Sequence, residues 1–68
     1  MIDERLTGTV ESFDARGRGR VRRDDALGYA YVRPRDLDRA DLRIGNRLSF
    51  HLQDRRAVNL RREFRRGE

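Results

Sequence analysis

Apolar residues are sparse along the chain, yet in five short segments they alternate with polar residues, as in half-buried β-strands. The alternation is clearest in GYAYVR (28–33), where Ala30 and Val32 face one side and the tyrosines the other. In RLSFHL (47–52) every second residue is apolar. Less regular alternation marks three further segments, 5–13, 16–22 and 57–61. The pattern predicts five β-strands.

The intervals between these strands predict turns rather than long helices. Turn-forming residues occupy three of them, 22–28, 45–46 and 53–56. Pro34 ends the third strand, and 35–45 is too short and too broken for a long helix. We expect a loop there, with one helical turn near Leu37. Five short strands joined by turns favour an all-β fold, a small five-stranded antiparallel barrel that is closed or nearly closed.

The same alternation predicts which side chains fill the barrel. The expected inward set is Leu6, Val10, Val21, Ala30, Val32, Leu37, Ile44, Leu48, Phe50, Leu52, Val58 and Leu60. Each large side chain that is fully buried contributes roughly 1.5–3 kcal/mol, so this set offsets the ordering entropy only narrowly.

The segment RGRGRV (16–21) is either a disordered basic stretch or a strand with its cations on one face. An extended chain places Arg18, Arg20 and Arg22 on one side. Gly17, Gly19 and Val21 then share the other side, where glycine suits a tight bend that leaves no room for a side chain. We therefore expect a strand with its arginines pointing outward together.

Composition limits the chain to a small basic domain. Its 68 residues suffice for one domain, expected at 1–61, followed by a basic tail at 62–68. Charged residues make up 43% and hydrophobic residues 35%, and the formal net charge is +5. All 17 basic residues are arginine. An arginine-favouring codon bias explains this, and so does a use of guanidinium to bind phosphate and stack on bases; both explanations stay open.

Cellular location and catalysis follow from what the sequence lacks. There is no cysteine, no apolar run of the roughly 20 residues that cross a membrane, and no signal-peptide pattern in MIDERLTG (1–8). His51 has no evident nucleophile partner, Asp24-Asp25 falls in a turn, and no metal-ligand spacing or phosphate loop is present. We expect a monomeric cytoplasmic protein that is not an enzyme and takes no metal or cofactor.

The order of short motifs resembles that of cold-shock domains. GTVESFD (8–14) resembles the family's Gly-x-Val-Lys-Trp-Phe-Asn, and RGRGRV (16–21) resembles Lys-Gly-Phe-Gly-Phe-Ile. YVRPRDL (31–37), IGNRLSFHL (44–52) and AVNL (57–60) fall where the later family motifs are expected. The resemblance covers about residues 6–61 and implies an OB-type barrel that binds single-stranded nucleic acid.

The departures from the family concern its aromatic binding surface. Ser12 stands where the family has tryptophan, and Arg18 and Arg20 stand where it has phenylalanine. Arg33 and Pro34 replace histidine and phenylalanine in the second motif. Only Phe13 and Tyr31 keep the aromatic character. The scaffold is similar, while arginine largely replaces the stacking surface.

The leading hypothesis is a single-strand RNA- or DNA-binding protein that acts as an RNA chaperone or expression modulator. The expected binding residues are Phe13, Arg16, Arg18, Arg20, Arg22, Tyr29, Tyr31 and Arg33. The arginines would contact phosphates or bases, and the aromatic rings would stack. We expect little sequence selectivity and a steep dependence on salt. Arg47 and His51 are expected to lie outward on the fourth strand, away from this surface.

Other readings of the same residues remain open. The arginine face could dock on an acidic protein partner, or be an ordinary solvated face balanced by the 12 acidic residues. The barrel could also be a ribosome-associated OB domain of the S1 or initiation-factor type. If the arginines contact phosphates alone, duplex DNA is a further candidate ligand.

Overall fold

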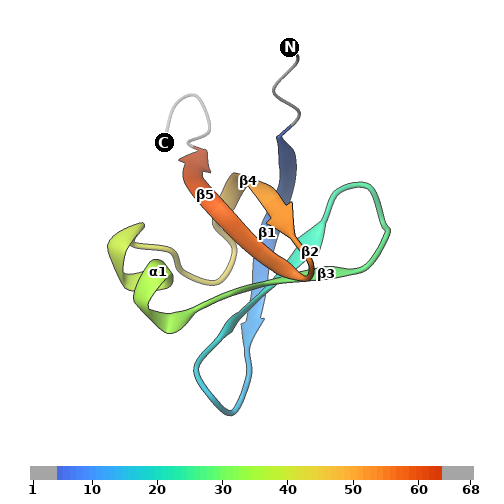
Figure 1. Cartoon of the computed structure of the whole chain (residues 1–68). Coiled ribbons are helices and arrows are strands. Elements are labelled where there is room, and N and C mark those ends of the chain that lie inside the picture. Colours follow the sequence, from blue (N-terminus) through green and yellow to red (C-terminus); the bar gives the residue numbers. More distant parts are fainter. Residues whose placement is uncertain (1–4, 64–68) are drawn as a thin grey trace.

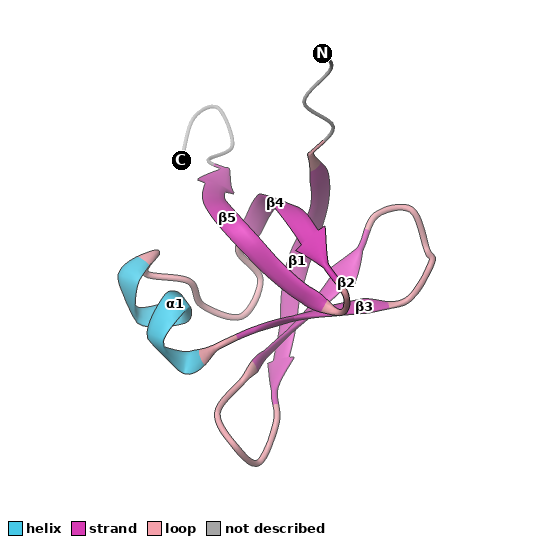
Figure 2. Ribbon diagram, in the orientation of Figure 1, coloured by secondary structure: helices cyan, strands magenta, loops and turns pink. Residues whose placement is uncertain are grey.

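The computed structural model describes residues 5–63, which form an all-β domain with a closed five-stranded barrel, as the sequence predicts. The elements in chain order are β1 (Leu6–Phe13), β2 (Gly19–Arg23), β3 (Tyr29–Val32), α1 (Pro34–Arg39), β4 (Arg47–Gln53) and β5 (Arg56–Glu63). The strands curl around one another, and α1 lies to one side of them, between β3 and β4 in the chain (Figures 1 and 2). The expected helical turn near Leu37 is thus a helix of 6 residues.

The strands form a ring in the order β1-β2-β3-β5-β4. Four of the neighbouring pairs are antiparallel, and β3 pairs with β5 in parallel. Five strands cannot alternate in direction all the way round a closed ring, so one neighbouring pair must be parallel. This parallel junction consists of the pair Tyr31 and Arg56, with the Tyr31 N–H donating to the Arg55 carbonyl at 2.8 Å.

Most of the predicted core is buried as expected. The buried hydrophobic residues are Val10, Val21, Ala30, Val32, Leu37, Leu42, Leu48, Phe50 and Ala57. Leu6, Leu52 and Leu60 are partly buried and pack against this core. The prediction for Ile44 is wrong, because the turn backbone bonds to Val10 and leaves the Ile44 side chain 60% exposed. Leu42, which follows α1 and donates its N–H to the Leu37 carbonyl, is buried instead.

The second strand begins later than the sequence pattern suggests. The Asp14 carboxylate accepts hydrogen bonds from the backbone N–H groups of Arg16 at 2.9 Å and Arg18 at 2.8 Å, which holds this segment in a turn. Gly17 has a φ of 81° in that turn rather than a place in the strand. Gly19 faces inward as predicted, since a Cβ there would lie 2.8 Å from Leu37 Cδ2.

A β-bulge in β5 changes which of its side chains face the core. His51 pairs with Val58 and Ser49 with Arg61, so two residues of β5, Asn59 and Leu60, lie opposite Phe50. Before the bulge Ala57 is buried, and Val58, which the sequence places inside, is only half-buried. β5 continues to Glu63, past the strand end expected at residue 61, and the rest of the predicted tail, 64–68, lies outside the described residues.

Asn59 is the residue that the bulge places in the left-handed region, with a φ of 52°. Asparagine and glycine tolerate this conformation, whereas a β-branched residue loses about 1–2 kcal/mol there. We therefore expect Asn59→Val to lower the free energy of unfolding by about 1–2 kcal/mol or slightly more, since the hydrogen bond between Asn59 Nδ2 and His51 Nδ1 at 3.1 Å is also lost. Urea unfolding measures the change. Asn59→Gly is the control, and equal stability of the two variants would contradict this account.

Candidate nucleic-acid interface

Strand pairing gathers arginine and tyrosine on the outer face of β2 and β3. Arg20 lies opposite Tyr31 and Arg22 opposite Tyr29, while the alternate positions are buried. Strict alternation therefore points these four side chains away from the core. Together with Arg18, which directly precedes β2, they form a surface that we name the arginine–tyrosine platform.

Each tyrosine ring of the platform is covered by a guanidinium group. Arg20 Cζ lies 3.8 Å from the centroid of the Tyr29 ring, and Arg18 Cζ lies 4.9 Å from that of Tyr31. The Arg20 contact is diagonal, because Arg20 lies opposite Tyr31 and reaches past it to Tyr29. Such cation–π contacts hold a flexible side chain in place. The platform therefore presents positioned guanidinium groups backed by aromatic rings.

The arginines differ in how far their charge is already neutralised. Arg18 Nε bonds to the Asp14 carboxylate at 2.6 Å, and Arg33 Nε lies 3.1 Å from Asp36. Within residues 5–63, Arg20 and Arg22 take part in no ion pair, and the buried Nε of Arg20 has no hydrogen-bond acceptor. The centre of the platform therefore keeps its positive charge available for an anionic ligand.

The Asp14 carboxylate is held ionised by the loop that it organises. Desolvation raises its pKa, but the hydrogen bonds from Arg18 and Arg16 outweigh this and leave the pKa below its ordinary value. Asp14 therefore remains a negatively charged partner of Arg18 and competes there with any phosphate.

The remaining predicted binding residues lie around the platform or away from it. Arg16 sits in the loop between β1 and β2, and Arg33 precedes α1 as its N-cap. Phe13 lies opposite Gly19, an inward position, and is 46% exposed at the end of β1. Pleat alternation thus places Phe13 on the other side of the sheet from Arg20, and it is not part of the platform.

The structure adds residues from the β4–β5 turn that sequence reasoning did not select. A hollow of about 490 Å³ beside the platform is lined by Arg18, Tyr31, Arg33, Gln53, Asp54, Arg55 and Arg56. The segment 53–56 reads as an ordinary turn in the sequence. Its place beside Tyr31 depends on the parallel β3–β5 junction, which no local pattern signals.

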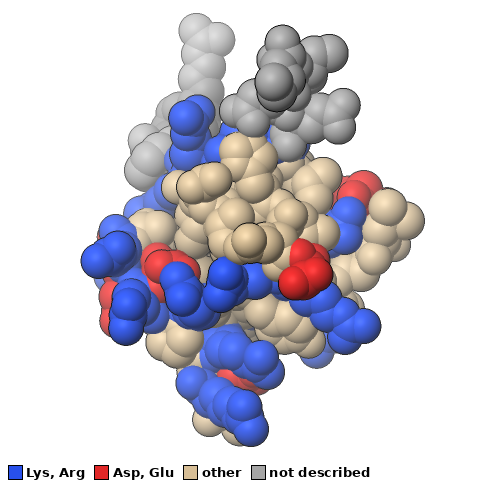
Figure 3. Space-filling view, in the orientation of Figure 1, with Lys and Arg blue, Asp and Glu red and all other residues tan. Residues whose placement is uncertain are grey.

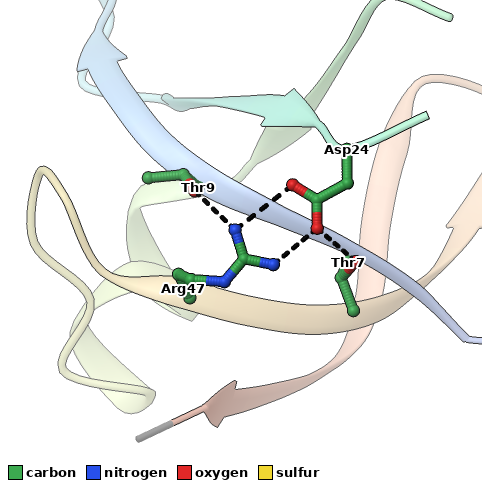
Figure 4. Close-up of polar contacts among 4 residues, drawn as sticks. All are labelled: Thr7, Thr9, Asp24 and Arg47. Atoms are coloured by element: carbon green, nitrogen blue, oxygen red, sulfur yellow. Dashed lines mark hydrogen bonds and ion pairs between the residues drawn. The ribbon is translucent and has the colours of Figure 1, made fainter. Parts of the chain in front are cut away.

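A cluster of four polar side chains lies at the edge of the platform (Figure 4). Arg47 at the start of β4 bonds to both carboxylate oxygens of Asp24, at 3.2 and 2.5 Å, and to Thr9 Oγ1 at 3.2 Å. Thr7 Oγ1 donates to the same carboxylate at 2.5 Å. Thr9 lies opposite Arg22, so Arg47 borders the platform rather than lying away from it as the sequence suggested. The cluster ties β4 across β1 to the end of β2.

This cluster predicts a loss of stability in acid. The hydrogen bonds from Arg47 and then Thr7 lower the pKa of Asp24 below its ordinary value of 3.8, while burial raises it. The contribution is therefore complete at neutral pH and is lost as the pH falls from 3.8 through the lowered pKa. Because the partners are partly exposed, we expect Asp24→Asn to cost only about 1 kcal/mol at pH 7, measured by urea unfolding.

The pH series supplies the control for this prediction. The difference between the wild-type chain and Asp24→Asn should shrink as the pH is lowered below 3.8. Asp38→Asn, on the exposed side of α1, should change stability far less at any pH. A deficit for Asp24→Asn that stays constant with pH would mean that the ionised carboxylate contributes nothing.

Comparison of the chain with models of protein families, with curated proteins and with solved structures finds no match. Within residues 5–63 there is no group of three or more histidine, aspartate or glutamate side chains that could hold a metal ion. Over the same residues, no helix has the length and apolar character needed to span a membrane. The platform and its surroundings are therefore the features of this chain that bear on its function.

Proposed function

We propose that this protein binds single-stranded nucleic acid, RNA or DNA, through the arginine–tyrosine platform, without catalysing a reaction. The observation that carries the proposal is the pair of guanidinium groups resting on the outward rings of Tyr29 and Tyr31. Single-strand binders combine positive charge along the backbone with flat groups on which bases stack. The platform supplies both on one face of a small closed barrel.

In this mechanism phosphate contacts dominate and stacking is secondary. Arg20 and Arg22, which have no ion pair within residues 5–63, would take phosphates or lie flat on bases. A base that stacks on the side of either tyrosine where the guanidinium lies would meet that guanidinium before the ring. Few groups are positioned to read base edges, so binding is expected to tolerate most sequences.

This mode of binding suits a cold-shock-like RNA chaperone or modulator of expression. Such a protein has to cover single strands of many sequences and release them again. Contacts with phosphate that depend on counterion release are sequence-independent and reversible. We place this activity in the cytoplasm, with the monomer as the binding unit.

Fluorescence anisotropy of labelled single-stranded RNA, single-stranded DNA and duplex DNA of equal length tests the proposal. Single strands are expected to bind more tightly than duplex, and affinity should fall steeply as salt is raised. The chain has 2 tyrosines, both in the platform, so NMR spectra of protein labelled at the tyrosine rings report contact directly. Absence of single-strand binding at low salt would overturn the proposal.

A second candidate is docking of the platform on an acidic protein. The observation that favours it is that each tyrosine ring already carries a guanidinium group, from Arg18 or Arg20, where a base would otherwise stack. In that case the tyrosine ring signals would respond to an acidic polypeptide and not to either single strand.

A further inference from the structure

The hollow beside the platform exists because the barrel closes there over a single residue pair. The β3–β5 junction holds only Tyr31 and Arg56 in register, so the two strands part on either side of it. The turn at 53–56 stands over the gap, anchored by the hydrogen bond from the Tyr31 N–H to the Arg55 carbonyl. The resulting space of about 490 Å³ opens next to the ring that Arg18 covers.

Four arginines from three separate segments surround this space. Arg18 comes from the loop before β2, Arg33 directly precedes α1, and Arg55 and Arg56 come from the β4–β5 turn and the start of β5. Figure 3 shows basic side chains along the left and the lower part of the molecule, where α1 and the β1–β2 loop lie, with acidic side chains between some of them. We name this space the arginine hollow.

Much of the positive charge in the arginine hollow is free to act on a ligand. Within residues 5–63 Arg55 takes part in no ion pair, and Arg56 bonds to the neutral amide of Gln53 at 3.0 Å. The single carboxylate of the lining is Asp54, while Arg18 and Arg33 are each paired with an aspartate outside the lining. Several guanidinium donors thus remain for an anion that enters from the open side.

We propose that the arginine hollow binds a phosphomonoester, the terminal phosphate of a nucleic-acid strand whose next base lies on the platform. This inference rests on the proposed function and adds that the protein recognises the end of the nucleic-acid strand. An internal phosphodiester carries one negative charge and presents two free oxygens. A phosphomonoester carries close to two charges at neutral pH and presents three oxygens.

The geometry of the lining favours the phosphomonoester over the diester. Guanidinium groups bind phosphate oxygens in a forked, bidentate manner, and here they approach from three chain segments rather than along one line. The covered ring of Tyr31 forms one wall, so a terminal base can stack beside the phosphate that the hollow holds.

The test compares oligonucleotides of one sequence that differ only at their ends. The ends are hydroxyl on both sides, 5′-phosphate, 3′-phosphate, and a 5′-phosphate carrying a methyl ester, which keeps the group but removes its second charge. Fluorescence anisotropy measures the affinity of the protein for each oligonucleotide, made both as RNA and as DNA, at one fixed salt concentration. A nucleoside monophosphate is added as a competitor of the oligonucleotide. We expect a phosphate on one of the two ends to tighten binding by about fivefold or more, and its methyl ester to lose most of that gain.

Two variants assign the effect to the hollow. Arg55→Gln is expected to reduce the ratio between phosphorylated and unphosphorylated affinity to near one, because Arg55 has no other ionic partner within residues 5–63. Arg61→Gln removes the same charge from an exposed position of β5 outside the hollow and should leave the ratio unchanged. Circular dichroism spectra of both variants serve to check that they are folded.

The outcomes separate this inference from the proposed function. Equal binding of all strands, an effect that survives methylation, or a ratio that Arg55→Gln leaves intact overturns the phosphomonoester site while single-strand binding stands. Competition by the nucleoside monophosphate supports the site. No binding of any strand would overturn both proposals.

Discussion

Replacing Arg18 and Arg20 together with glutamine is expected to weaken binding of single-stranded RNA by roughly thirtyfold or more at low salt, about 2 kcal/mol. The Cζ atoms of these two side chains lie 4.9 and 3.8 Å from the ring centroids of Tyr31 and Tyr29. The change therefore removes both guanidinium groups that lie over the tyrosine rings of the platform. It also removes two charges. The slope of log affinity against log salt should fall by about 1.4, since each phosphate contact on a single strand contributes about 0.7.

Replacing the same two residues with lysine separates charge from shape. Lysine keeps the positive charge but lacks the flat guanidinium that stacks on aromatic groups and forks onto phosphate. The lysine variant should therefore keep the salt slope of the wild-type chain and still lose part of the affinity. Equal affinity of the lysine variant and the wild-type chain would show that only charge matters at these positions.

A second double variant controls for net charge. Arg39→Gln with Arg61→Gln removes two charges from α1 and β5, outside the platform. We expect it to weaken binding by only a few-fold, through long-range attraction. If it weakens binding as much as the platform variant does, the ligand does not sit on the platform.

The barrel and the platform were predictable because both depend on local alternation. In β3 the order Tyr29, Ala30, Tyr31, Val32 allows only one division into inner and outer faces. The neighbouring strand has the same period, so pairing the two necessarily brings their arginines and tyrosines together. This inference needs no knowledge of the remaining strands.

Features that depend on contacts distant in the sequence were not predictable. The bulge at Asn59 reverses the expected roles of Ala57 and Val58, and a period of two cannot signal an inserted residue. Phe13 looks like a stacking residue in the sequence, but its pairing with Gly19 places it on the inner side. The arginine hollow requires the turn at 53–56 to meet Tyr31 across the parallel junction, and nothing in the turn itself indicates that partner.

Phe50→Ala is expected to remove a large part of the protein's free energy of unfolding. Phe50 is fully buried in β4 and is among the largest side chains of the core. Removing such a ring costs about 3–5 kcal/mol, because transfer energy is lost and a cavity remains. A chain of 68 residues has a total stability on the order of 3–10 kcal/mol. Circular dichroism and urea unfolding should show a midpoint shifted to much lower urea, or a population that is mostly unfolded.

Phe13→Ala is the matched control, since it removes the same side chain from another strand of the same barrel. Phe13 is 46% exposed, so the loss should be no more than about 1 kcal/mol. A similar loss from both variants would mean that Phe50 does not fill the core. The folded Phe13→Ala protein also tests the interface. Phe13 lies on the inner side of the sheet and outside the platform. We therefore expect the affinity of the Phe13→Ala protein for single-stranded RNA to stay within about twofold of the wild-type value.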